Sequence, residues 1–446
     1  MKKTLLLSLL IFLTTNVLSQ KISGIVLDSI SNKPIEKAHI FLNNKVFFTN
    51  KKGRFSFYHK KKTQQVFTVS HLQYHKKNIS YQKNSRNLII YLKEKKEVLS
   101  EVNIKSKQFK KNKVHYQNLN KLPKPIHSFA STIKDDKIYV FGGDASVIRD
   151  DVRRGLNELV FNSFQEILNF LSKPKTKSFH TYLGNIFCYN FQLNKWSQKE
   201  NSIRPKAYHN VISYKEKFYL FGGKRFSKKK TREYLEDKIE VYKLSDQSIK
   251  IDNTNPHQAV NFESILYQDK IIFIGGSTKK LENGKKKYIN KVHFYDLKSG
   301  YWYLLTQMSK GKETKGIIAN DKLYLFGGYK NKALKEIEVY NLKTGKWKHI
   351  GNLFNGMKNP AITKHKNIIY MFENSRIITF NIITKTLKEY IIDLKFYSSK
   401  MHYYKNKLFI MGGYFSSQFD KVPSSGFYSI DIKEFVNTKP FNIKTL

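Results

Sequence analysis

The sequence predicts an all-β protein in which a small β-sandwich precedes a six-bladed β-propeller that carries one helical insertion. Three observations predict this fold. Short segments of alternating polar and apolar residues recur between Lys21 and Leu92, which is typical of the strands of a sandwich. From about Asn112 onward, a strand-sized unit that ends in two glycines recurs at intervals typical of stacked repeats. Only residues 148–175 show a long apolar periodicity of three and four.

The N-terminus has the order of a secretory signal peptide. Lys2 and Lys3 precede an apolar run from Leu5 to Leu13, and small residues follow before Gln20. We therefore expect residues 1–19 to be removed and the mature chain to be exported, to the periplasm, to the outer surface or into the medium. The apolar run is too short to span a bilayer comfortably, and no cysteine near Gln20 offers a site for a lipid. The sequence predicts no transmembrane segment.

The chain is strongly basic, with 81 Lys and Arg against 34 Asp and Glu and a formal charge of +47. Such a charge favours weak binding of polyanions. A base composition rich in A and T is an alternative explanation, because lysine, isoleucine, asparagine and tyrosine are all abundant. The lysines are spread along the chain and form no single stripe, so we expect no specific nucleic-acid site.

Between residues 20 and 95 we expect the sandwich, followed by a linker over residues 96–111. The expected strands are Ile22 to Leu27, Ala38 to Leu42, Arg54 to Tyr58, Gln65 to Ser70 and Asn87 to Leu92. Their order, with Gly24, Gly53-Arg54-Phe55 and the later Leu99-Ser100-Glu101-Val102, resembles the carboxypeptidase regulatory-like domain of exported Bacteroidetes proteins over residues 21–104. The resemblance implies a seven-stranded immunoglobulin- or transthyretin-like sandwich without catalytic capacity.

Residues 112–446 contain six copies of the repeat. The copies end at Gly142-Gly143, Gly222-Gly223, Gly275-Gly276, Gly327-Gly328 and Gly412-Gly413, and a degenerate copy, Asn367 to Glu373, lacks both glycines. A tyrosine and then a tryptophan follow in several copies, as in Tyr295 and Trp302. This pattern resembles the kelch repeat, which forms one four-stranded propeller blade.

Two segments depart from the repeat. The interval between Gly142 and Gly222 is about 30 residues longer than the later ones. It contains apolar residues at helical spacing from Asp150 to Leu171, which predicts one amphipathic helix docked on the propeller or the sandwich, or else offered to a partner. Residues 112–117 match the outer strand of a blade, and the last copy lacks such a strand, so we expect the N-terminal segment to close the ring.

The loops before the innermost strands should meet at one mouth of the central channel. Counting back from each glycine pair gives the expected ligand-binding residues, which differ between copies: Arg204, His209, Asn210, Glu263, Lys315, Asn359, Lys400 and His402. The same count also yields His127, Asn261, Lys312 and Glu313. The alternative is that these are only solvated channel residues without a ligand.

The sequence favours a non-catalytic binding or scaffolding protein that recognises a glycan or a protein at the propeller mouth. The alternative comes from a resemblance to kelch propellers that act as sugar mutarotases or sialic-acid epimerases without a metal, and His209 and Glu263 would then be acid and base. Galactose oxidase-like copper enzymes share this propeller, but the single cysteine, Cys188, lies in a regular strand where a structural thiol is expected. No metal-ligand spacing, phosphate loop or serine-hydrolase turn is present, so the sequence predicts no cofactor.

Overall fold

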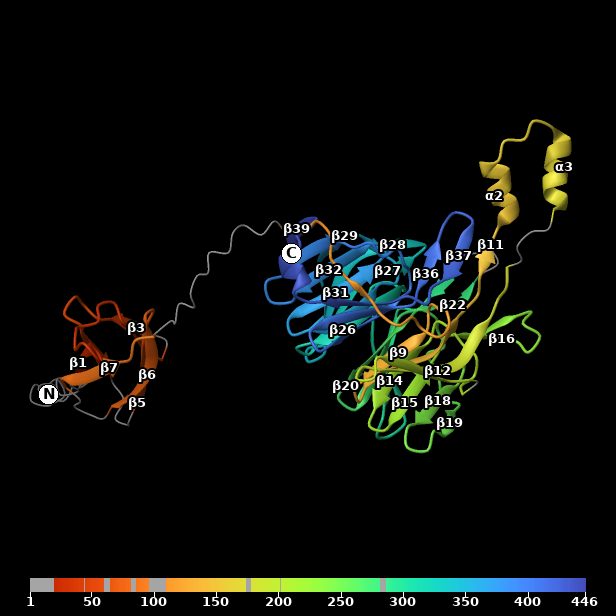
Figure 1. Cartoon of the computed structure of the whole chain (residues 1–446). Coiled ribbons are helices and arrows are strands. Elements are labelled where there is room, and N and C mark those ends of the chain that lie inside the picture. Colours follow the sequence, from red (N-terminus) through yellow and green to blue (C-terminus); the bar gives the residue numbers. More distant parts are fainter. Residues whose placement is uncertain are drawn as a thin grey trace, which may run out of the picture. The chain divides into compact units, whose positions relative to one another are not determined.

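A computed structural model of the chain describes residues 20–43, 45–59, 65–81, 86–95, 110–173, 178–200, 202–280 and 286–446. The chain divides into two compact units, Met1–Gln108 and Phe109–Leu446 (Figure 1). The expected signal peptide, residues 1–19, lies outside the described residues, as do residues 96–109 of the expected linker.

The first unit is a sandwich of two sheets. Its strands are β1 (Gln20–Asp28), β2 (His39–Leu42), β3 (Lys45–Phe48), β4 (Arg54–His59), β5 (Gln65–His71), β6 (Tyr74–Tyr81) and β7 (Leu88–Leu92). One sheet has the order β4-β1-β7 and the other β3-β2-β5-β6. Strand β1 pairs antiparallel with β4 and parallel with β7.

The sandwich core forms because alternate residues of each strand point inward. Phe55 and Phe57, which share one face of β4, are both buried and pack with Phe67 of the opposite sheet. Gly24 permits a close approach of strands, since a Cβ there would lie 2.4 Å from the Leu88 carbonyl oxygen. The expected sandwich is confirmed.

The second unit contains six four-stranded blades. Blades 1 to 3 consist of β9 (Ala130–Lys134), β10 (Lys137–Asp144), β12 (Tyr182–Asn190) and β13 (Lys195–Lys199); β14 (Asn210–Tyr214), β15 (Lys217–Phe221), β18 (Ile239–Lys243) and β19 (Ile249–Asp252); and β20 (Glu263–Tyr267), β21 (Lys270–Ile274), β24 (Lys291–Asp296) and β25 (Trp302–Gln307). Blades 4 to 6 consist of β26 (Glu313–Ala319), β27 (Lys322–Lys330), β28 (Lys332–Asn341) and β29 (Lys346–Met357); β30 (Ala361–His365), β31 (Ile368–Glu373), β32 (Arg376–Asn381) and β33 (Thr386–Ile391); and β34 (Lys400–Tyr404), β35 (Lys407–Met411), β38 (Phe427–Asp431) and β8 (Gln117–Asn118).

The innermost strands form a closed ring. Strands β9, β14, β20, β26, β30 and β34 contact one another in this order, and β34 contacts β9. The N-terminal segment closes the ring as the sequence predicted, but the closing strand is Gln117–Asn118 where residues 112–117 were expected: β8 pairs with β38 through Asn118 opposite Tyr428. The C-terminal strand β39 (Asn442–Thr445) was not expected; it adds a fifth strand to the outer edge of blade 5 beside β33. Both ends of the unit therefore cover sheet edges.

The glycine pairs of five blades adopt backbone conformations that side chains disfavour; they follow the second strand in blades 2, 3 and 6 and interrupt its register in blades 1 and 4. Gly222 and Gly223, for example, have φ of 59° and 83°. Blade 5 lacks such a pair because its chain turns back at once: Asn374 and Ser375, with φ of 43° and 64°, join β31 directly to β32. Loss of the glycines thus accompanies loss of a long loop on this blade.

In other blades the loop after the glycine pair continues beyond the sheet. These loops form the short strands β16 (Lys224–Phe226) and β17 (Glu233–Leu235) in blade 2, β22 (Ser277–Lys280) and β23 (Lys286–Tyr288) in blade 3, and β36 (Tyr414–Ser416) and β37 (Asp420–Pro423) in blade 6, where β11 (Ile148–Arg149) of blade 1 joins them. The chain ends with a short helix, α4 (Glu434–Asn437), and β39.

The insertion in blade 1 corrects a prediction. The expected single helix is two helices, α2 (Asp151–Glu158) and α3 (Phe164–Ser172), which stand away from the blades (yellow, Figure 1). The second helix starts anew because Ser163 accepts a hydrogen bond from the Glu166 backbone N–H, and Glu166 in turn accepts one from Asn162. Apolar side chains of both helices are exposed, among them Leu156 at 47% and Phe164 at 73%, so they are not docked on the propeller as expected.

Candidate functional site at the channel mouth

Two cavities meet in the ring at the end where the innermost strands begin. The inner cavity, about 240 Å³, lies between strands β9, β14, β20, β26, β30 and β34. The outer cavity, about 940 Å³, is lined by the segments before these strands and by the loops that follow the glycine pairs. The two cavities share four lining residues, Tyr208, Asn261, Asn359 and Ser398. They therefore form one site, in which the inner cavity is the floor and the outer cavity is the rim.

Three of these shared residues adopt a backbone conformation that is rare outside glycine. Tyr208, Asn261 and Ser398 have φ of 60°, 52° and 52°, and each stands two positions before an innermost strand. Ser128 holds the equivalent place in blade 1 with φ of 51° and lines the inner cavity. Non-glycine residues held this way cost about 1 kcal/mol each, and such strain concentrates at functional sites.

The inner cavity brings together seven of the eight predicted ligand-binding residues. They are His209, Asn210, Glu263, Lys315, Asn359, Lys400 and His402. They come from blades 2, 3, 4, 5 and 6, so they converge only because the ring is closed. Asn261 lies among them too, whereas His127, Lys312 and Glu313 do not line this cavity.

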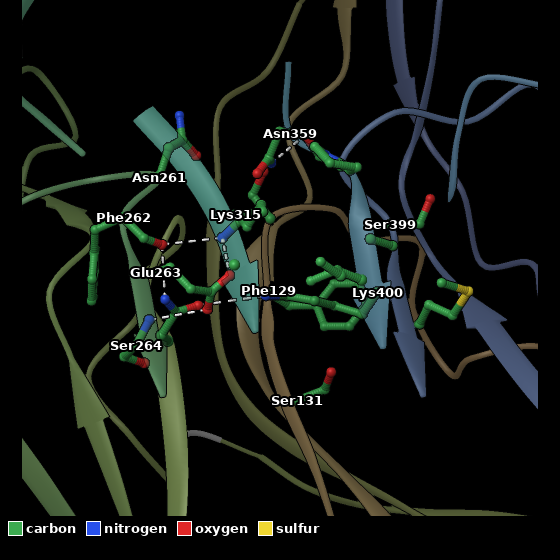
Figure 2. A pocket seen from close by; sticks show the side chains of 18 of the residues that line it. Phe129, Ser131, Asn261, Phe262, Glu263, Ser264, Lys315, Asn359, Ser399 and Lys400 are labelled. Carbon is green, nitrogen blue, oxygen red and sulfur yellow. Dashed lines mark hydrogen bonds and ion pairs between the residues drawn. The ribbon is translucent and has the colours of Figure 1, made fainter. Parts of the chain in front are cut away.

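One wall of the inner cavity is a fixed polar network (Figure 2). The Phe262 backbone carbonyl accepts hydrogen bonds from Lys315 Nζ at 3.1 Å and from the Asn210 amide at 2.9 Å. Lys315 Nζ also lies 3.7 Å from Glu263 Oε2, and Glu263 Oε1 accepts the Ser264 backbone N–H. Lys315 and Glu263 are therefore held as a pair with its charges facing the channel.

Lys400 faces this network from blade 6. Its Nζ lies 3.5 Å from Asn210 Oδ1, and no described carboxylate comes within 4.0 Å. Burial, reinforced by the nearby Lys315 charge and opposed by Glu263, lowers the Lys400 pKa to about 7. His402 lies two residues on; its Nε2 is 2.8 Å from Ser131 Oγ, and burial together with the Lys400 charge lowers the His402 pKa to about 3.

His209 lies deeper in the wall than the sequence suggested. It is 2% exposed, and neither ring nitrogen has a hydrogen-bond partner of regular geometry. Burial and the neighbouring cations, Lys206 and Lys400, hold the His209 pKa well below its usual value. The ring is neutral and enclosed, so it shapes the cavity wall and offers no accessible nitrogen to a ligand.

Arg204 is not part of either cavity, which corrects its expected position. Its guanidinium contacts Glu236 at 2.7 Å, and its backbone N–H donates to Glu240. Lys312 likewise forms a buried ion pair, with Glu338 at 2.5 Å. Counting back from the glycines selected Arg204 and Lys312 because the charged pairs of blades 2 and 4 lie in the same short segment as the channel residues.

The outer cavity contains residues that the sequence did not identify. They are Lys224, Arg225, Glu233, Tyr234, Asp237, Gln258, Ser277, Thr278, Lys286, Lys358, Tyr414 and Lys421. The Tyr208 hydroxyl is fixed at 2.7 Å from Asp144 Oδ2 and lies 3.5 Å from Lys421 Nζ. Lys421 also lies over the Tyr414 ring at 4.5 Å. Most of these residues belong to the loops after the glycine pairs.

These loops were identifiable in principle. Adjacent strands of a blade are antiparallel, so the loop after the second strand returns to the end where the first strand begins. The Lys228-Lys229-Lys230 and Lys285-Lys286-Lys287 runs belong to these loops, and Lys286 lines the outer cavity.

The described residues show no cluster of three His, Cys, Asp or Glu side chains arranged for a metal ion. Cys188 is partly buried in β12, where burial raises its pKa. No helix in the described part of the chain is long and apolar enough to cross a membrane.

Two family models match parts of the chain. The family described as the KLHDC2/KLHL20/DRC7 Kelch-repeats domain matches residues 173–381, and the CarboxypepD_reg-like domain matches residues 22–104. A solved structure described as "Structure of YjhT" is similar at 12% identity with a TM-score of 0.49, covering 69% of this chain and 96% of that one. No curated protein matches.

The closed ring of six blades with glycine pairs at its mouth defines a kelch-type propeller. The chain contains a kelch-repeat domain, matched over residues 173–381, and a CarboxypepD_reg-like domain that precedes it in the sequence.

Proposed function

We propose that this propeller is an exported, non-catalytic binding protein that holds a glycan at the channel mouth. The observation that carries this proposal is the set of strained residues, Tyr208, Asn261 and Ser398, at the junction of the two cavities. Strained residues concentrate at functional sites, and the Tyr208 side chain lines both cavities, where a ligand can contact it.

The lining suits a sugar in both size and chemistry. A cavity of about 940 Å³ accommodates several pyranose rings. Tyr234, which is 44% exposed, offers ring surface to a sugar, and Asn261 and Asn359 offer amides to hydroxyl groups. The leader expected over residues 1–19 would place such a protein outside the cytoplasm, with the sandwich as a spacer or docking module.

A glycan array probed with the mature chain tests this proposal. We expect binding to a restricted set of glycans that persists at about 0.5 M salt, where exposed charges are screened within about 4 Å. Tyr208→Ala should remove this binding. The matched variant Tyr301→Ala, at a tyrosine 67% exposed outside both cavities, should leave it intact. Binding that Tyr208→Ala does not weaken, or no binding, would refute a glycan site here.

The alternative, a metal-independent sugar mutarotase, needs His209 and Glu263 to reach one substrate. Glu263 lines the inner cavity, but the His209 ring nitrogens are enclosed. An acid and a base must both touch the reacting sugar, so the site favours binding without chemistry. Anomer exchange of a bound sugar, followed by NMR, should run at the uncatalysed rate; acceleration that is lost in Glu263→Gln would favour the mutarotase.

A further inference from the structure

The propeller contains fully buried lysines in its walls and half-buried lysines in its channel, and the two kinds differ in how their charge is neutralised. Lys206 and Lys312, in the segments that lead into blades 2 and 4, are fully buried, and each has a glutamate as direct partner, Glu240 and Glu338. Lys400 and Lys421, which line the channel, have no described carboxylate within 4.0 Å. The ammonium groups of Lys206 and Lys312 are neutralised by the chain itself, and those of Lys400 and Lys421 are not.

The abundance of lysine does not account for this difference. A basic chain has many exposed lysines, and water solvates their charge at little cost. Lys400 is instead enclosed by the ring, and its neighbours at the cavity wall are an amide, another cation and two neutral histidines. A buried charge without a counter-ion is unfavourable by several kcal/mol unless something supplies the opposite charge.

The nearest carboxylate is already engaged. Glu263 lies 3.7 Å from Lys315 Nζ, so the floor of the site contains two ammonium groups and one carboxylate. The remaining titratable groups at this floor are His209, His402 and Tyr208, and the pKa shifts of all three favour their neutral forms at neutral pH. When Lys400 is protonated, the inner cavity therefore has one positive charge in excess.

We propose that Lys400, together with Lys315, binds an anionic group of the glycan, a carboxylate or a sulfate ester, at the floor of the inner cavity. This inference rests on the proposed function and adds the class of ligand. The negatively charged oxygen of the ligand would neutralise Lys400 in the way that Glu240 and Glu338 neutralise Lys206 and Lys312. On the rim, Lys421 lies above Tyr414 where a longer acidic glycan would pass.

The proposal predicts a specific pH dependence. The Lys400 pKa is about 7 in the free protein, and an anion beside the ammonium favours its charged form. Binding above pH 7 therefore takes up a proton, and affinity for the anionic ligand decreases as the pH rises from about 6 to about 9. Tyr208 stays neutral over this range because burial holds its pKa well above the usual value.

The test compares acidic glycans with their own neutral forms. Uronate-bearing glycans and their carboxyl-reduced counterparts, and sulfated glycans and their desulfated counterparts, are titrated into the mature full chain by calorimetry. We expect the acidic form to bind about tenfold or more tightly than its neutral form, the value of a charged hydrogen bond. Lys400→Met should remove this preference, whereas the exposed Lys250→Met should not.

The outcomes separate this inference from the proposed function. Equal affinity for acidic and neutral forms, or a preference that survives in Lys400→Met, would overturn the anion site and leave glycan binding in place. Absence of all binding would overturn both. A preference for uronates over sulfates, or the reverse, would identify the group. Thermal unfolding of Lys400→Met shows that the variant is folded, and its stability should be equal to or higher than that of the native chain because a buried charge is removed.

Discussion

Lys206 and Glu240 form an ion pair in which both side chains are almost completely excluded from solvent, one in the segment leading into blade 2 and the other in its third strand. Lys312 and Glu338 repeat this pair in blade 4. The two pairs hold equivalent places because Glu240 and Glu338 each precede Val-Tyr in the repeat. They fasten the segment that carries channel residues to the body of its own blade.

Removing one partner should therefore destabilise the propeller strongly. Lys206→Met leaves Glu240 charged and buried, and we expect a loss of about 3–5 kcal/mol, partly recovered in the Lys206→Met/Glu240→Met double variant. Tryptophan fluorescence in urea measures this in the propeller alone, because Trp196, Trp302 and Trp347 all belong to its blades. The exposed pair Lys243 and Asp246 is the control, and Lys243→Met should change stability by about 0.5 kcal/mol or less. Equal effects of the two lysine variants would contradict a structural role for the buried pair.

The glycine pairs should not tolerate a side chain, because a Cβ atom would clash with neighbouring atoms and because their φ angles are positive. In Gly223→Ala the new Cβ would stand 2.4 Å from the Ala207 carbonyl oxygen and 2.7 Å from the His209 Cβ. Gly300 also has a positive φ, but its nearest atom is 3.7 Å away, so Gly300→Ala measures backbone strain alone at about 1–2 kcal/mol. We expect Gly223→Ala to cost at least about 2 kcal/mol more than Gly300→Ala in urea unfolding. Similar values would mean that the segment before β14 shifts easily.

Closure of the ring can be tested at one backbone hydrogen bond. The Leu119 N–H donates to the Phe427 carbonyl at 2.8 Å, next to the paired strands β8 and β38. Leu119→Pro removes this donor, whereas Leu119→Ala keeps it and loses only the side chain. The proline variant should be less stable than the alanine variant by about 1–3 kcal/mol, the cost of an unsatisfied carbonyl. Equal stability of the two variants would show that this edge contributes little to closure.

The fold was predictable because it is repeated. Six copies of one unit identify the blade even where one copy, Asn367 to Glu373, has lost its glycines. The channel floor was predictable for the same reason, since residues such as Glu263 and Lys400 begin innermost strands of different blades.

The rest of the site depends on features that the repeat does not specify. Lys421 lies in a loop of irregular length, so no count from the glycines reaches it, and Tyr414 directly follows a glycine pair, whereas the count ran only backward from the glycines. Arg204 was assigned to the channel because its distance from the glycine pair fits, yet its side chain turns to Glu236 inside the blade wall. The break between α2 and α3 was detectable, since Ser163 and Glu166 have the spacing of a capping box. The apolar periodicity, considered alone, predicted one continuous helix.

Buried histidines should make the propeller acid-sensitive well above the range in which carboxylates titrate. His257 is 1% exposed, with Nε2 at 2.8 Å from the Gly275 carbonyl oxygen and Nδ1 at 2.9 Å from His293 Nδ1. Burial lowers the pKa of His257 to about 4 and that of His127 to about 3. In the unfolded chain a histidine has a pKa of about 6.5, so between about pH 4 and 6.5 the unfolded state binds more protons than the folded one. The stability that each neutral histidine contributes is therefore complete above pH 6.5 and is lost as the pH falls.

At pH 5 the loss amounts to about 2 kcal/mol for each such histidine. We expect the unfolding midpoint in urea, followed by tryptophan fluorescence, to fall between pH 7 and pH 5, and to fall less steeply in His257→Gln, which has no proton to gain. The exposed His349→Gln should keep the full slope, because its side chain is solvated in both states. A midpoint that does not change between pH 7 and pH 5 would mean that the rings accept protons in place, which requires water or a carboxylate beside them. Since Asp144 Oδ2 lies 3.4 Å from His127 Nε2, His127 would be the first ring to examine in that case.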